Sequence, residues 1–261
     1  MNLSGAVKTF KKLDRLDNNP DLPRIEKAIC EACEKGTLDL VVFVCPKFNT
    51  AALLSDQSEK YMPIDANDPD DLFFQRIPKI KQLLADLITL GIDPKLNLLI
   101  GDNDAEVYIF PYIKTLSLNF AVFNQRRNAY LGSFTQRATN LFKDNVRVES
   151  LGLNKVIPSK LRPNVQDTDL EREIRFFSWL FGETGPYKGK LSFDEKTLRE
   201  MAVRKFALYG AQGTYLEKTR KGGVLLQTEG PGVWLLRTQM LRCTGSGGIP
   251  AIYPWIRKEE S

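Results

Sequence analysis

Two apolar runs constrain this chain more than any other feature, because each has the composition of a β-strand that is buried on both faces. The first is LDLVVFVCP, residues 38–46, and the second is LNLLI, residues 96–100. Strands of this kind belong in the middle of a parallel sheet covered by helices. Residues 70–90, between the two runs, carry apolar side chains at helical spacing, and Pro78 should kink this helix or split it in two. The pattern predicts a strand–helix–strand unit.

The same alternation continues along the chain. Helical patterns cover 21–36, 118–144, 169–183 and 193–219, and further strand patterns lie in 146–153, 222–234 and 249–256. Alternating strands and helices predict an α/β fold, a Rossmann-like three-layer sandwich with a mostly parallel central sheet. We expect a single domain over residues 1–261, made of N-terminal helices (1–36), a βαβ core (37–154), and C-terminal helices and strands (155–261).

Polar segments directly follow three of the predicted strands. They are CPKFN after the first strand, GDND after the second, and TEGPG after VLLQ. In open parallel sheets, ligands bind outside the carboxyl ends of the strands. We therefore expect these three segments to meet at one ligand site.

The sequence contains 0 histidines. This excludes Ser-His-Asp and Cys-His hydrolases in their usual form, and it excludes His-ligated zinc or iron centres. Acid–base chemistry must then fall to Asp, Glu, Tyr, Lys or Cys, and a bound metal would be a hard cation such as Mg²⁺ or Mn²⁺ on oxygen ligands. The glycine patterns of dinucleotide-binding folds and of P-loop NTPases do not occur in the expected context, which disfavours both classes.

Asp102 and Asp104 are the leading catalytic candidates. They lie two residues apart after a predicted strand, and side chains two apart in an extended segment face the same way. Both carboxylates could bind one substrate amine or one divalent cation. The alternative is a solvated turn, because Asp and Asn favour turns.

The other loops supply further candidates. Glu229 and Tyr253 are candidates for proton transfer, and Lys47 could bind a phosphate of the substrate. Cys45 is a candidate substrate-binding residue, and as a nucleophile it would have no histidine to activate it. The remaining substrate-binding candidates are Asn49, Asn103, Tyr209 and Trp255. For Glu229 and Tyr253 the alternative is a tight turn and a packed terminal strand.

A basic helix, NQRRNAYLGSFTQRATNLFKDNVR, opens a different hypothesis for a chain whose net charge is +5. Arg126, Arg127 and Arg137 could contact phosphates of an RNA such as tRNA. The aromatic residues of this segment recur at helical spacing, which favours a buried aromatic face with solvated arginines.

A CxxC pair, Cys30 and Cys33, lacks the second close pair of a zinc site, and we expect reduced, partly buried thiols.

Several motifs, taken in order, resemble the isocyanide synthase and dityrosine-biosynthesis family. They are VFVCPKFN, LLIGDND, PYKGKLSF, VLLQTEG and YPWI, spread over residues 40–256. The resemblance implies a Rossmann-like enzyme that converts an amino acid, with a pentose phosphate donor, into an isonitrile. This chain has Gly-Asp-Asn where the family has Ser-Asp-Gly, and it lacks the histidines of the two later motifs.

The late IYP segment and the basic helix also resemble the tRNA-dependent cyclodipeptide synthases. The catalytic serine of that family has no counterpart in FVCPKFN. Both resemblances imply an enzyme that handles an amino acid.

We therefore expect a transferase that acts on a free or activated amino acid. The alternatives are a cyclodipeptide synthase-like enzyme that uses aminoacyl-tRNA, a metal-dependent nucleotide-sugar transferase that uses the DxD, and a non-enzymatic RNA-binding protein. No cofactor is required by the sequence, although Mg²⁺ or Mn²⁺ fits the carboxylates. No apolar run approaches the roughly 18 residues of a membrane span, so we expect a cytoplasmic protein.

Overall fold

The computed structural model describes residues 3–14, 19–44, 72–101, 107, 110–112, 120–151, 167–183, 192–226 and 248–254. The elements in chain order are α1 (Leu3–Leu13), α2 (Leu22–Lys35), β1 (Thr37–Val44), α4 (Leu72–Thr89), β2 (Asp93–Ile100), η1 (Phe110–Tyr112), α6 (Phe120–Phe142), η2 (Lys143–Asn145), β3 (Val146–Ser150), α7 (Asp167–Phe181), α8 (Glu195–Thr219), β4 (Val224–Leu226) and β5 (Ala251–Ile252). No helix in these ranges is long and apolar enough to cross a membrane.

The strands form one five-stranded sheet in the order β3-β2-β1-β4-β5. All four strand pairs are parallel, which confirms the predicted α/β, Rossmann-like fold. β1 and β2 pair along their whole length, from Thr37 opposite Asp93 to Val44 opposite Ile100. The two apolar runs of the sequence are therefore the centre of the sheet and its neighbour.

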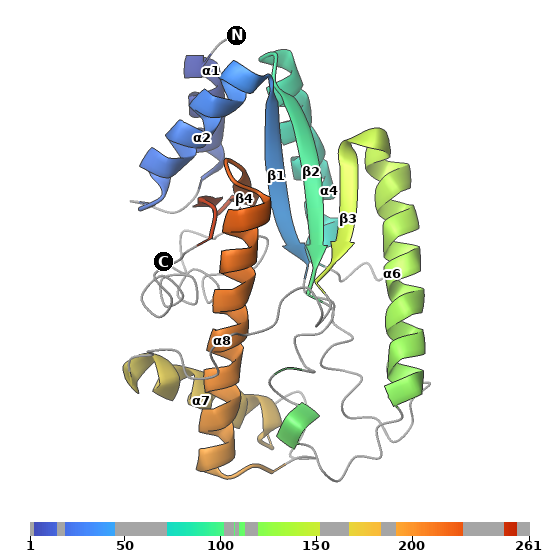
Figure 1. Ribbon diagram of the computed structural model, residues 1–261, viewed down its shortest axis with the longest axis vertical. Helices are drawn as coiled ribbons and strands as arrows, with labels where there is room; N and C mark the ends of the chain where they lie inside the picture. The colour runs from blue at the N-terminus through green and yellow to red at the C-terminus, as the bar shows by residue number, and fades with distance from the viewer. Residues whose placement is uncertain are drawn as a thin grey trace.

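Helices cover both faces of this sheet (Figure 1). On one face, Leu40 and Val42 belong to a large core cluster that includes residues of α1, α2, α4 and α6, and this cluster continues into α7 and the first half of α8. On the other face, Val41 packs in a smaller cluster with Leu208 and Leu216 of α8. The alternation of adjacent β1 residues between the two clusters gives the three layers that the two-sided apolar runs predict.

α4 differs from its prediction at Pro78. The helix continues through this proline to Thr89, so the expected division into two helices does not occur. The proline is exposed, and its missing N–H removes one backbone hydrogen bond from the helix. Buried Ile77, Ile80 and Leu84 lie around the proline and hold the helix against the sheet.

The edge strand β5 is sealed by side chains from the link between α1 and α2. Asn19 Nδ2 donates a hydrogen bond to the Ala251 carbonyl at 2.9 Å, and the Ala251 N–H donates to Asp21 Oδ2 at 3.2 Å. The Tyr253 N–H donates to Asp14 Oδ1 at 3.3 Å. These contacts satisfy backbone groups that an open sheet edge would present to another strand.

A buried polar cluster fixes the end of α8 to the opposite edge strand. Arg220 Nη2 lies 2.7 Å from Glu149 Oε2 on β3, and both side chains are buried. The Tyr215 hydroxyl donates a hydrogen bond to the other carboxylate oxygen of Glu149. Burial raises the pKa of Tyr215, and the adjacent Glu149 carboxylate adds to this increase.

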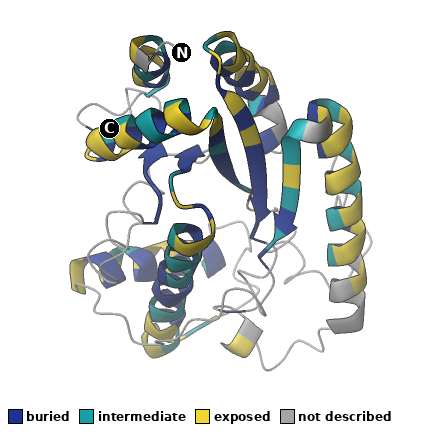
Figure 2. Cartoon of the chain, turned by 45° about the horizontal axis from the view of Figure 1, so that its top comes forward, coloured by how far each residue is buried: buried dark blue, intermediate teal, exposed yellow. Residues whose placement is uncertain are grey.

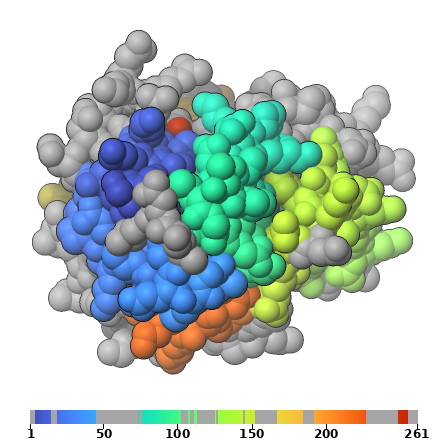
Figure 3. All heavy atoms as spheres, turned by 90° about the horizontal axis from the view of Figure 1, so that it is seen from above, coloured from blue at the N-terminus to red at the C-terminus, as the bar shows by residue number. Residues whose placement is uncertain are grey.

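The amino ends of the strands lie at the top of the molecule in Figure 1. Seen from above in Figure 3, atoms of α2, α4, α6 and α8 lie around this end. At the opposite end, α7 and the first half of α8 extend beyond the carboxyl ends of the strands (Figure 1). Figure 2 shows β1 and β2 as mostly buried between these layers.

Candidate functional site

The carboxyl ends of the strands lie side by side at one edge of the sheet. Val44 pairs with Ile100, Ile100 pairs with Ser150, and Leu226 pairs with both Val42 and Ile252. The segments that follow β1, β2, β4 and β5 therefore all start at this edge.

The strand order reverses between β1 and β4. From β1 the chain proceeds through β2 to β3 on one side, and then returns to β4 and β5 on the other side. Such a reversal is the topological switch point at which open α/β sheets bind their ligands. The site is therefore expected outside the carboxyl ends of β1 and β4, flanked by β2 and β5.

The predicted polar segments are attached around this switch point. Gly101 directly follows β2, and its buried N–H donates a hydrogen bond to the Val44 carbonyl at 2.9 Å. The segment with the two aspartates thus begins in contact with the end of β1. Most of the predicted residues themselves lie outside the described ranges: Cys45, Lys47, Asn49, Asp102, Asn103, Asp104, Glu229 and Trp255.

Tyr253 is the one predicted proton-transfer residue within the described ranges. It directly follows β5, and its side chain is only 2% exposed in the smaller core cluster, which also holds Leu99 and Leu225. This is the packing that the alternative of a packed terminal strand expects. The Tyr253 side chain is therefore packed in the core on the face of the sheet that α8 covers, and it is not exposed at the carboxyl edge.

Tyr209, a predicted substrate-binding residue, lies half-buried on α8. One turn away, Lys205 forms a buried ion pair with Glu173 of α7, with Nζ 2.7 Å from Oε2. The Lys205 ammonium lies 4.6 Å from the ring centre of Phe176 and 5.9 Å from that of Tyr209. This charged pair holds together the two helices that extend beyond the carboxyl edge.

The pair of Lys205 and Glu173 was not predicted from the sequence. A signal was present, because each residue occupies a position within the apolar face of its helix. Glu173 follows Leu170 at a spacing of three, and Lys205 follows Met201 at a spacing of four. A lysine on one buried helical face and a glutamate on another are most simply explained by a pair between the two faces.

Tyr112 lies in the short helix η1, which follows β2 in the chain. It contacts Arg204 of α8, the residue before Lys205. Arg204 Nε donates a hydrogen bond to the Tyr112 hydroxyl at 2.8 Å, and the guanidinium lies 5.5 Å from the ring centre. Burial raises the pKa of Tyr112, although the Arg204 hydrogen bond acts in the opposite direction. The contact joins η1 to α8 through a tyrosine hydroxyl that acts as the hydrogen-bond acceptor.

The basic helix α6 buries its aromatic face. Tyr130, Phe134 and Phe142 are all less than 10% exposed, and Phe134 packs against Phe73 of α4 with ring centres 5.3 Å apart. Arg127 and Arg137 are half-buried, and the side chain of Arg126 is outside the description. The aromatic residues therefore belong to the core, as their helical spacing indicates, and they are not available to stack on bases.

The two cysteines of the CxxC pair are free thiols on α2, and both are half-buried. Burial raises the pKa of Cys33, and the neighbouring Cys30 adds to this increase. Within the ranges given above, no group of three or more Cys, Asp or Glu side chains is placed to hold a metal ion.

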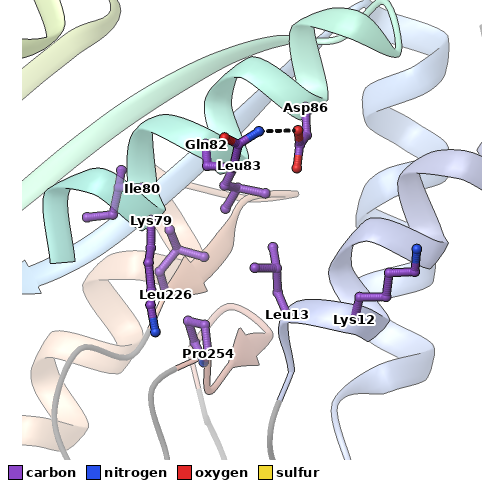
Figure 4. Close-up of a pocket in the computed structure, with 9 residues that line it drawn as sticks. All are labelled: Lys12, Leu13, Lys79, Ile80, Gln82, Leu83, Asp86, Leu226 and Pro254. Carbon is purple, nitrogen blue, oxygen red and sulfur yellow. Dashed lines mark hydrogen bonds between the residues drawn. The ribbon is translucent and has the colours of Figure 1, made fainter.

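A hollow lies beside the carboxyl end of β4, between α1 and α4 (Figure 4). Its volume is about 230 Å³, and Leu226 and Pro254 line it from the sheet side. It adjoins the switch point on the face of the sheet that α4 covers.

Comparison with protein-family models finds no match to this chain. A search of curated proteins also finds no match.

Proposed function

We propose that this protein is a Rossmann-like enzyme, a transferase that acts on a free or activated amino acid at the carboxyl edge of its sheet. In this proposal Asp102 and Asp104 bind the substrate ammonium group, and Lys47 binds a phosphate of the second substrate or of the activated amino acid. Glu229 is the proton-transfer residue. Tyr253 is buried, so in this proposal it packs beneath the site and does not transfer protons.

The observation that carries the proposal is the position of the switch point. The segments that hold Lys47 and Glu229 follow β1 and β4, the two strands between which the order reverses. The two aspartates follow β2, which is the next strand along. Neighbouring strands lie about 4.8 Å apart, so the starting points of these segments span about 10 Å, the size of an amino-acid substrate with its reacting group.

The chemistry of the segments supports an amine-containing substrate. A pair of carboxylates gives an ammonium group the counter-charge and the hydrogen-bond acceptors that it requires. Without histidine, a glutamate at the edge of the site is a suitable group to accept a proton. The resemblance to isocyanide synthases in VFVCPKFN and LLIGDND points to the same class of substrate.

The proposal is tested by expressing the protein in a bacterium and analysing the small molecules that accumulate by mass spectrometry. We expect a nitrogen-containing product derived from an amino acid, an isonitrile on the leading hypothesis. A cyclic dipeptide would instead identify the aminoacyl-tRNA-dependent alternative. If no amino-acid-derived product accumulates, and purified protein binds no amino acid, the proposal is wrong.

The aspartates are tested with a matched control at the other end of β2, the strand that precedes them in the chain. Asp102→Asn with Asp104→Asn should abolish the product, because the amides cannot neutralise an ammonium group. Asp93→Asn, at the amino end of β2, should leave it unchanged, since Asp93 is half-exposed and forms a surface ion pair with Lys95. Loss of product on addition of EDTA, with recovery on addition of Mn²⁺, would assign the aspartates to a metal and favour the nucleotide-sugar transferase.

A further inference from the structure

The hollow between α1 and α4 has an apolar interior. Ile80 and Leu83 of α4 and Leu226 of β4 are buried, with exposed fractions of 1%, 3% and 0%. Leu13 extends from the end of α1 toward α4, and Pro254 closes the side next to β5 (Figure 4). At about 230 Å³ the hollow is smaller than a drug-sized pocket of roughly 300–1,000 Å³, and it matches a short apolar ligand.

Charge is distributed unequally along this hollow. Lys79 extends from α4 toward Pro254, at the end nearest the carboxyl edge of the sheet (Figure 4). Asp86 lies seven residues farther along α4, which corresponds to about 10 Å, and it accepts a hydrogen bond from Gln82 at 2.8 Å. Of the α4 side chains that line the hollow, the two charged ones, Lys79 and Asp86, are thus at opposite ends.

The lysines of the hollow have no acidic partner in the described residues. Lys79 of α4 and Lys12 of α1 line the hollow without an ion pair to any residue in those ranges. By contrast, Lys11, the neighbour of Lys12, lies 2.7 Å from Glu26. An ammonium group at the mouth of an apolar hollow gains most from an anion that the hollow itself holds in place.

We infer that this hollow is a binding site for a small organic anion with an apolar body, such as a short-chain or aryl-substituted carboxylate. The apolar body would lie on Ile80, Leu83 and Leu226, and the carboxylate would contact Lys79 at the end near Pro254. Binding in this orientation keeps the anion about two helical turns away from Asp86. The inference is independent of the proposed function, because none of these residues belongs to the proposed catalytic segments.

The test measures binding of hexanoate to the full chain by isothermal titration calorimetry, with hexanamide and hexylamine as uncharged and cationic probes of the same length. Hexanoate should bind more tightly than hexanamide, and hexylamine should bind least. Lys79→Glu should weaken hexanoate binding by at least about tenfold, because it removes a charge-assisted contact and adds repulsion. Lys79→Arg should retain binding.

Lys81→Glu is the matched control, because it makes the same change in charge on the same helix. Lys81 does not line the hollow, and its ammonium lies 5.9 Å from the ring centre of Phe142. Its replacement should change hexanoate affinity by less than about twofold, a screened long-range effect. Circular dichroism of each variant verifies folding, which we expect to persist because Lys79 is exposed.

Absence of hexanoate binding to the wild-type protein would overturn the inference. So would equal binding of hexylamine, or equal effects of Lys79→Glu and Lys81→Glu. Hexanoate binding should also be unchanged by Asp102→Asn with Asp104→Asn, so failure of the hollow and failure of the proposed function give different results.

Discussion

The buried ion pair between α7 and α8 makes a quantitative prediction about the part of the molecule beyond the carboxyl edge. The side chains of Lys205 and Glu173 are each 8% exposed, and their charged atoms lie 2.7 Å apart. Removing one partner of such a pair leaves a buried charge without compensation, which typically costs about 3–5 kcal/mol. Replacing both partners with apolar residues of similar size is often neutral.

For Glu173→Leu we expect a loss of about 3 kcal/mol in the free energy of unfolding, the lower end of that range. The cost is reduced because the rings of Phe176 and Phe177, 4.6 and 5.4 Å from the ammonium, still face the charge. Lys205→Met should cost a similar amount. The double variant Glu173→Leu with Lys205→Met should lie within about 1 kcal/mol of the wild type.

The assay is urea unfolding followed by circular dichroism, arranged as a double-mutant cycle. Asp167→Asn is the matched control, because Asp167 and Arg199 join the same two helices at 2.8 Å but are 80% and 47% exposed. The control should cost less than about 1 kcal/mol. If the losses of the two single variants simply add in the double variant, the pair does not carry the coupling that we assign to it.

Three further predictions concern the rest of the fold. Burial and Glu149 raise the pKa of Tyr215, so its contribution to stability is complete below the ordinary tyrosine pKa of about 10 and is lost as the pH rises above it. Tyr215→Phe should thus flatten the alkaline decline in urea midpoint, and parallel declines would contradict this. Asn19→Ala should lower the free energy of unfolding by about 1–3 kcal/mol, because it leaves the Ala251 carbonyl of β5 without this hydrogen bond, and an unchanged urea midpoint would refute the role of Asn19 at this edge. Gly223→Ala should lower the midpoint of thermal unfolding, because the added Cβ would lie 3.0 Å from a backbone oxygen of β1. Gly132→Ala on α6 should raise it, because the Cβ there has no such neighbour within 4 Å and alanine favours a helix. The reverse order of the two midpoints would contradict the packing.

Local patterns were sufficient to predict the elements of the fold. The two-sided apolar runs at 38–46 and 96–100 predict β1 and β2 because only central parallel strands bury both faces. The helical periodicity of residues 118–144 predicts α6 and its buried aromatic face. These features depend on neighbours in the sequence, and the structure confirms them.

Features that depend on distant contacts could not be predicted in the same way. The order of the strands depends on the strand beside which β4 lies, and no local sequence pattern indicates that neighbour. The Asn19 side chain, for example, donates a hydrogen bond to the Ala251 carbonyl, 232 residues away in the sequence. Of the two effects expected at Pro78, a kink or a division of the helix, the division does not occur, because tertiary packing of α4 outweighs the lost hydrogen bond. The candidate site was predictable as an edge of the sheet, since the rule for parallel sheets needs only the strand ends.

The central claim, that amino acids bind at the carboxyl edge of the sheet, is tested most directly by methyl NMR. Protein labelled at Ile, Leu and Val methyl groups would be titrated with an equimolar mixture of the proteinogenic L-amino acids. The strand ends offer reporters at both edges, since Val44, Ile100 and Leu226 lie at the carboxyl edge, and Leu38 and Leu96 lie toward the amino edge. We predict chemical-shift changes at the first three residues and none at the other two. Changes confined to Leu38 and Leu96, or no changes at any of the five, would contradict the claim.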